Sequence, residues 1–276
     1  MTATAHGRTP DRGGRVPAWA AARTRLGLIA LLLGLAAVGW WWTAREMRDM
    51  DGGPWTELGT AAWFLGVWIV MMAAMMFPSV APTVALYSKL RNTRALGGPL
   101  LFTSGYLLVW GAAGLLAYAL ARIGGTLFGD AFAWDSAGRW IAGGTLLVAA
   151  AYELTPLKDV CLGKCRTPLG FLVGSWRDGL SGAVRMGARH GAWCVGCCWA
   201  LMASLFALGV MSVVWMAVVA GLIAFEKLIP SRRLATYGTA ALLLVLGVLM
   251  LVAPDVIPAL QIPGAGSMSQ MTEMSP

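Results

Sequence analysis

Long runs of apolar residues alternate with short polar segments along most of the chain. Each run is close to the roughly 20 residues that a helix needs to cross the hydrocarbon core of a membrane. The runs lie at about residues 26–42, 58–77, 99–121, 138–157, 191–210, 211–229 and 234–253. The fifth and sixth runs meet at residues 209–212 and are compatible with a tight helical hairpin. The pattern therefore predicts an all-α fold, a polytopic integral membrane helix bundle of about seven transmembrane helices.

The composition agrees with a membrane protein. The 276 residues are 58% hydrophobic and 12% charged, whereas ordinary soluble domains carry roughly 25% charged residues. The net charge of +8 does not indicate nucleic acid, because the basic residues form short clusters between apolar runs. The lipid bilayer is the partner that this pattern implies.

The basic residues also predict an orientation. With seven spans, 17 of the 21 Lys and Arg residues fall in the N-terminal tail and in the segments 79–98, 158–190 and 227–233. These segments would share one side of the membrane, and the positive-inside rule makes that side cytoplasmic. We expect a cytoplasmic N-terminus and an outer C-terminus. The predicted organisation is a disordered basic tail (1–25), a transmembrane domain (26–254) and a flexible Met-containing tail (255–276).

All five cysteines are confined to 38 residues, from 161 to 198. Cys161 and Cys165 are one helical turn apart. His190, Cys194, Cys197 and Cys198 fall at i, i+4, i+7 and i+8, which is one stripe of a helix. If the two groups face each other, at least four sulfurs surround one ion, which suits zinc or Cu(I).

Two other interpretations of the cysteines remain open. Cysteine is a small residue that packs well between helices. Cys194 and Cys197 also form a C-x-x-C unit, although no thioredoxin-like context surrounds it. Histidines are few, and phosphate-loop, GxSxG and HExxH motifs are absent from the sequence. The pattern thus favours binding over catalysis.

Methionine, glutamate and histidine side chains provide weaker candidate ligands. Thioethers are soft donors for Cu(I), but methionine is also a flexible filler of helix interfaces. Glu153 is a candidate carboxylate ligand, a proton acceptor or a partner for Lys158. Lys227 is expected to anchor a helix end at the membrane interface. The weaker ligand set comprises His190, Met75, Met76, Met202 and Glu153.

Local backbone signals complete the prediction. Pro78 and Pro82 are expected to end or kink the second span. The segment 158–190 is expected to be a loop, part of which is amphipathic and lies in the membrane interface. The GxxxG spacings at Gly170/Gly174 and Gly187/Gly191 permit close contact between helices.

Three motifs together resemble those of a known family. They are WIVMMAAMMFPS at 68–79, YELTPLKDVCLGKCRTP at 152–168 and GARHGAWCVGCCWALM at 187–202. In this order they are similar to a bacterial family of unknown function, described as predicted metal-binding integral membrane proteins, over about residues 55–255. The resemblance implies a multi-pass protein of the bacterial inner membrane.

The function favoured by the sequence is binding of a soft transition metal, Cu(I) or zinc, at a cytoplasmic-side cysteine cluster, for transport, delivery or assembly. A membrane partner or a protein that exchanges the metal would then be involved. One alternative is a membrane thiol oxidoreductase. Another is a non-catalytic subunit of a membrane complex.

Overall fold

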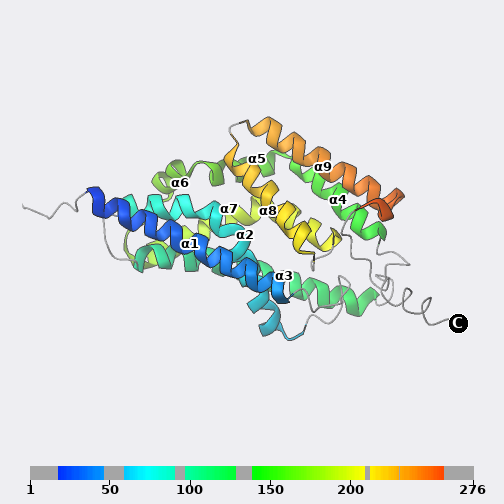
Figure 1. Ribbon diagram of the computed structural model, residues 1–276, viewed down its shortest axis with the longest axis horizontal. Helices are drawn as coiled ribbons and strands as arrows, with labels where there is room; N and C mark the ends of the chain where they lie inside the picture. Colours follow the sequence, from blue (N-terminus) through cyan, green and yellow to red (C-terminus); the bar gives the residue numbers. More distant parts are fainter. Residues whose placement is uncertain are drawn as a thin grey trace, which may run out of the picture.

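The protein is helical throughout the described part of the chain. The computed structural model describes residues 18–46, 59–90, 97–128, 139–208, 212–229 and 231–257. These contain α1 (Ala18–Glu46), α2 (Ala61–Leu90), α3 (Gly97–Phe128), α4 (Arg139–Glu153), α5 (Pro156–Arg166), α6 (Pro168–Ser175), α7 (Gly179–Leu208), α8 (Val213–Leu228), α9 (Arg232–Val252) and the short 3₁₀ helix η4 (Pro254–Val256). The predicted all-α class is confirmed (Figure 1). Most of the N-terminal tail and nearly all of the Met-containing tail lie outside the described residues.

Four of the described helices, α1, α2, α3 and α9, are long and apolar enough to cross a membrane. A fifth span results if α4 and α5, which meet at a bend of 69°, are counted together. Helix α8 has only 16 residues, and the first half of α7 carries Arg185 and Arg189. Among the described residues, four or five helices therefore meet the requirements of a span, not clearly the seven expected.

Helix α2 does not end at its prolines. It continues through Pro78 and Pro82 to Leu90, so of the two alternatives, a helix end or a kink, the helix end is wrong. A proline inside a helix removes one backbone hydrogen bond. In membrane helices this loss is tolerated because neighbouring groups satisfy the freed backbone atoms.

The predicted loop 158–190 is instead largely helical. Thr155 ends the preceding segment and caps α5, since its Oγ1 accepts a hydrogen bond from the backbone N–H of Lys158 at 3.3 Å. Pro156 occupies the first turn of α5, a position that needs no N–H donor. A second Thr-Pro pair, Thr167 and Pro168, starts α6, but the Thr167 side chain does not cap it and donates instead to the backbone oxygen of Gly163 at 2.8 Å. Helix α7 then begins at Gly179, twelve residues before the predicted span.

Helix α7 lies at the centre of the packing, against α3, α4, α5, α6 and α8. Its contact with α3 is close enough to require glycine on both sides. A Cβ at Gly187 would lie 1.9 Å from the backbone oxygen of Phe102, and a Cβ at Gly105 would lie 2.2 Å from that of Val184. Gly191 also faces α3. The Gly187/Gly191 spacing therefore forms a helix contact, as expected, whereas Gly174 faces open space.

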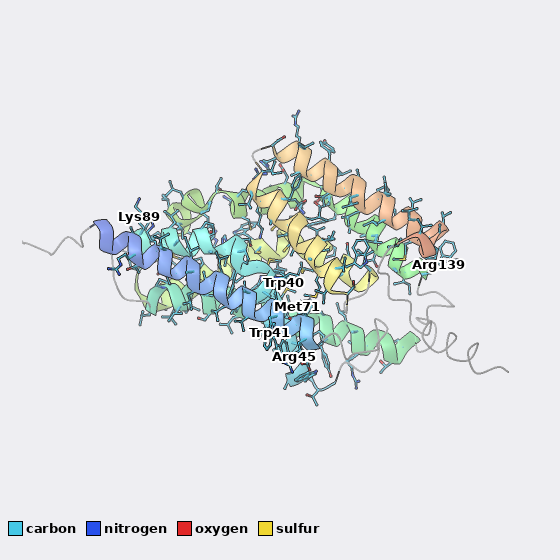
Figure 2. All side chains as sticks on the ribbon, viewed as in Figure 1. Trp40, Trp41, Arg45, Met71, Lys89 and Arg139 are labelled. Atoms are coloured by element: carbon cyan, nitrogen blue, oxygen red, sulfur yellow. The ribbon has the colours of Figure 1, made fainter. Side chains whose placement is uncertain are left out.

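The exterior of the bundle is strongly apolar, as a lipid-facing surface requires. Helix α1 packs on α2, and α4 lies beside α9 (Figure 1). Arg45 and Lys89 lie toward opposite ends of the α1–α2 pair (Figure 2). The Arg45 guanidinium stacks 5.7 Å from the ring centre of Trp41. The middle parts of α1 and α9 carry exposed apolar side chains, which include Leu31, Leu35, Val38, Leu244, Val245 and Val248.

Candidate metal centre

Two helices supply the cysteines, although Cys161 and Cys165 were expected in a loop. Helix α5 carries Cys161 and Cys165, and α7 carries the other three. All five are buried and reduced. His190, Cys194, Cys197 and Cys198 are all buried, with at most 3% of their surface exposed. The predicted stripe therefore faces the protein interior, where α5 packs against α7.

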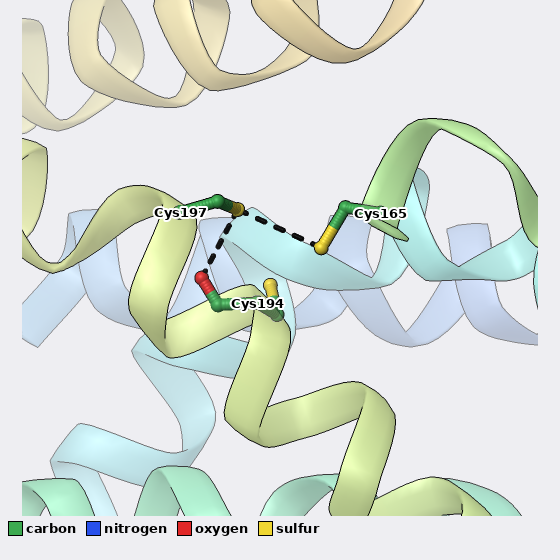
Figure 3. A group of neighbouring side chains, drawn as sticks. All are labelled: Cys165, Cys194 and Cys197. Atoms are coloured by element: carbon green, nitrogen blue, oxygen red, sulfur yellow. Dashed lines mark hydrogen bonds between the residues drawn. The ribbon is translucent and has the colours of Figure 1, made fainter. Parts of the chain in front are cut away.

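Three sulfurs converge where these helices meet. The Sγ atoms of Cys165, Cys194 and Cys197 all lie within 4.8 Å of one another. The sulfurs of Cys165 and Cys197 are separated by 3.7 Å, and these side chains point toward each other from α5 and α7 (Figure 3). Sulfurs around one ion with metal–sulfur bonds of about 2.3 Å are roughly 4 Å apart. The three thiols therefore have the spacing of a metal site.

The other two cysteines, Cys161 and Cys198, lie on the same two helices beside this group, and at least four sulfurs around one ion stays a prediction. The Cys198 thiol donates to the backbone oxygen of Cys194 at 2.9 Å. Cys161 packs against α7 at Gly196, where an added Cβ would lie 2.8 Å from its sulfur. Both residues thus help to pack the helices that carry the three convergent sulfurs.

Cys194 has two polar neighbours, Lys227 and Tyr106, that local sequence patterns do not indicate. The Lys227 ammonium donates to its sulfur at 3.3 Å and to the Ser79 hydroxyl at 3.1 Å. The Tyr106 hydroxyl lies 3.1 Å from the same sulfur. Lys227 was expected at the membrane interface, but it is turned inward to the cysteines. Nothing in the local sequence indicates these contacts, because they join residues on α2, α3, α7 and α8.

The weaker candidates occupy the same core but not the three-sulfur group. His190 is surrounded by aromatic rings, with the ring of Phe171 4.8 Å away and those of Phe102 and Tyr106 both at 6.0 Å. Three methionines are buried in the same apolar cluster as the cysteines, namely Met75, Met76 and Met202. Their role as ligands, like that of His190, stays a prediction.

Glu153 is a partner for Lys158, one of the roles considered above. The Lys158 ammonium lies 2.6 Å from a carboxylate oxygen of Glu153 on α4 and 2.9 Å from one of Glu226 on α8. All three side chains are at most 2% exposed. This buried ion triad joins α4, α5 and α8 and leaves Glu153 engaged away from the three sulfurs.

The donor set suits Cu(I) better than zinc. Structural zinc is almost always four-coordinate and tetrahedral, whereas the group offers three sulfurs. Thiolates are soft donors that bind Cu(I) as well as zinc, so the number of donors is what favours Cu(I). The cluster is also buried in an apolar core, which keeps water away from a bound ion.

Comparison with known proteins agrees with this chemistry. The model of the PpoB2 family, described as a copper chaperone, matches residues 65–250. The chain belongs to this family. The matched region runs from α2 into α9 and includes all five cysteines. Membership fits the metal-related family expected from the three motifs. No curated protein and no solved structure matches the chain significantly.

Proposed function

We propose that the protein binds Cu(I) at Cys165, Cys194 and Cys197 and delivers it to an acceptor protein at the membrane. The observation that carries this proposal is the convergence of three buried sulfurs within 4.8 Å. The copper chaperone description of its family supports the choice of metal. Binding and delivery require no chemical change of the protein, so the proposed role is not enzymatic.

Burial of the thiols argues against a thiol oxidoreductase. A redox pair needs an exposed thiolate that a substrate can reach. Cys194 and Cys197, which form the C-x-x-C unit, are 1% and 0% exposed. Cys165 is the most exposed of the three, at 8%, and we infer that an acceptor approaches bound copper from its side.

Individual cysteine substitutions test the ligand set. Replacement of Cys165, Cys194 or Cys197 by serine should lower the Cu(I) affinity by more than about 100-fold, because loss of an outer partner of a ligand alone costs 10–100-fold. The affinity is measured on anaerobically purified protein in detergent, by competition with bicinchoninic acid. Cys161→Ser is the matched control and should retain most of the affinity.

Two outcomes would contradict the proposal. Unaltered Cu(I) affinity in all three ligand variants would exclude this site. If the extent of thiol alkylation changes with the applied redox potential and does not change when copper is added, the oxidoreductase would be favoured. Under reducing conditions we expect Cu(I) to protect the thiols and a chelator to restore their reactivity, since thiolate ligation displaces the protons of the thiols.

We further propose that the three-cysteine group lies toward the cytoplasmic side. Basic residues surround it in the sequence, with Lys164 and Arg166 on α5 and Arg185 and Arg189 on α7, and such clusters favour the cytoplasm. Reporter fusions after residue 165 should therefore report a cytoplasmic location, and fusions after residue 265 the opposite side. The same side for both fusions would contradict an outer C-terminus.

A further inference from the structure

Cys194 differs from the other two sulfurs of the group in its polar contacts. Its sulfur meets the Lys227 ammonium at 3.3 Å and the Tyr106 hydroxyl at 3.1 Å. The close sulfur neighbour of Cys165 is instead Cys197, and the Cys197 thiol donates to the backbone oxygen of Cys194 at 3.2 Å. Of the three sulfurs, Cys194 is thus the one held by a cationic side chain.

Both contacts are held in place by other parts of the fold. Tyr106 is fully buried on α3, beside Gly105, where α3 touches the backbone of α7. Lys227 also donates to Ser79 of α2. Its neighbour Glu226 pairs with Lys158, which fixes this turn of α8 against α5. The two groups therefore approach Cys194 from two helices, α3 and α8, each of which is held by contacts with other helices.

We propose that Cys194 is the ligand that leaves first when copper is handed to an acceptor, and that Lys227 and Tyr106 are positioning residues that hold the departing thiolate. This inference rests on the proposed function and adds a step to it. Charge-assisted hydrogen bonds are about twice as strong as neutral ones. They withdraw electron density from the Cys194 sulfur, so its bond to copper is weaker than the bonds of Cys165 and Cys197.

The step is a ligand exchange without electron transfer. An incoming soft donor, a thiolate or an aromatic nitrogen, gives its lone pair to Cu(I). The bond between copper and the Cys194 sulfur breaks, and the sulfur keeps both electrons as a thiolate. Copper stays in the +1 state throughout. Lys227 balances the negative charge that develops on Cys194 inside an apolar core, where an unpaired charge is costly.

Transfer kinetics test this role directly. Protein loaded with one Cu(I) per chain is mixed with excess bicinchoninic acid, and the coloured copper complex is followed in a stopped-flow instrument. Lys227→Met should slow the transfer about tenfold, since a hydrogen bond to a charged group is worth about 1.5–3 kcal/mol and 1.36 kcal/mol is tenfold in rate. Tyr106→Phe should slow it less, about threefold, because an uncharged hydroxyl stabilises a thiolate less than an ammonium does. Lys227→Arg keeps the charge and should restore most of the rate.

The control is Lys164→Met, which removes a lysine charge next to Cys165 in the sequence but from an exposed side chain. It should transfer copper at the wild-type rate. A purely structural role for Lys227 predicts the opposite of our result, because a loosened site loses copper faster. Equal or faster transfer by Lys227→Met would overturn the inference. If that variant fails to load copper, equal or faster transfer by Tyr106→Phe would overturn it instead. Failure of the wild-type protein to load copper would instead refute the proposed function.

Discussion

Replacement of Lys158 by methionine should lower the free energy of unfolding by about 3–5 kcal/mol, the cost of leaving buried charges unpaired. Lys158 is the sole ammonium in contact with both Glu153 and Glu226 in the described structure, at 2.6 and 2.9 Å. The methionine side chain is similar in volume, so the change removes the charge without a large cavity. Two carboxylates would then remain together in an apolar environment, and α4, α5 and α8 would lose their common contact.

Thermal unfolding in detergent, followed by tryptophan fluorescence, measures this loss. Arg232→Met is the matched control, because Arg232 and its partner Asp159 are 44% and 59% exposed. Exposed ion pairs contribute about 0–1 kcal/mol, so this variant should unfold close to the wild-type temperature. The triple variant Glu153→Gln, Lys158→Met, Glu226→Gln removes all three charges and should recover much of the stability. A Lys158→Met protein as stable as Arg232→Met would show that the triad does not hold the helices together.

Substitution of Gly105 or Gly187 by alanine should also be strongly destabilising. The added methyl group would lie 2.2 or 1.9 Å from a backbone oxygen of the facing helix. Backbone atoms cannot rotate away as a side chain can, so α3 and α7 must separate. Overpacking of this kind costs typically about 1–3 kcal/mol, and we expect the upper end of that range for both variants.

Gly125, which lies on α3 like Gly105, provides the control. An added Cβ there meets no atom within 4 Å among the described residues. Gly125→Ala should be neutral or slightly stabilising, since alanine favours helix over glycine. The unfolding temperature should fall in the Gly105 variant, because the added methyl group forces α3 away from α7. Wild-type stability of Gly187→Ala would contradict the close contact of the two helices.

Helical periodicity predicted much of the site. The positions of Cys194, Cys197 and Cys198 on one face follow from a repeat of 3.6 residues, and these residues are buried as that face requires. The facing of α5 and α7 followed from the concentration of cysteines in two short segments. The Gly187/Gly191 contact was visible for the same reason, because small residues four apart mark a helix surface that another helix can approach.

The length of α2, the position of Lys227 and the convergence of the sulfurs depend on tertiary contacts, which local sequence patterns do not indicate. Pro78 and Pro82 indicated a helix end or a kink, and packing and backbone compensation continue α2 to Leu90. Lys227 follows an apolar run, a position typical of an interfacial anchor, and its contact with Cys194 depends on how α8 crosses α7. The convergence of Cys165, Cys194 and Cys197 depends on how α5 packs against α7.

The 69° bend between α4 and α5 gives the three-sulfur group an additional property. Cys194 and Cys197 lie on one face of a single helix and cannot surround an ion by themselves. The third sulfur comes from α5, which reaches α7 because the chain turns at Thr155 and Pro156. An ion held by all three sulfurs therefore binds only the folded arrangement, and its binding free energy adds to the stability of that arrangement. At a free-ion concentration of 100 times the dissociation constant, the gain in the free energy of unfolding is about 2.7 kcal/mol. The bound ion therefore stabilises the fold, and the fold in turn holds the ion.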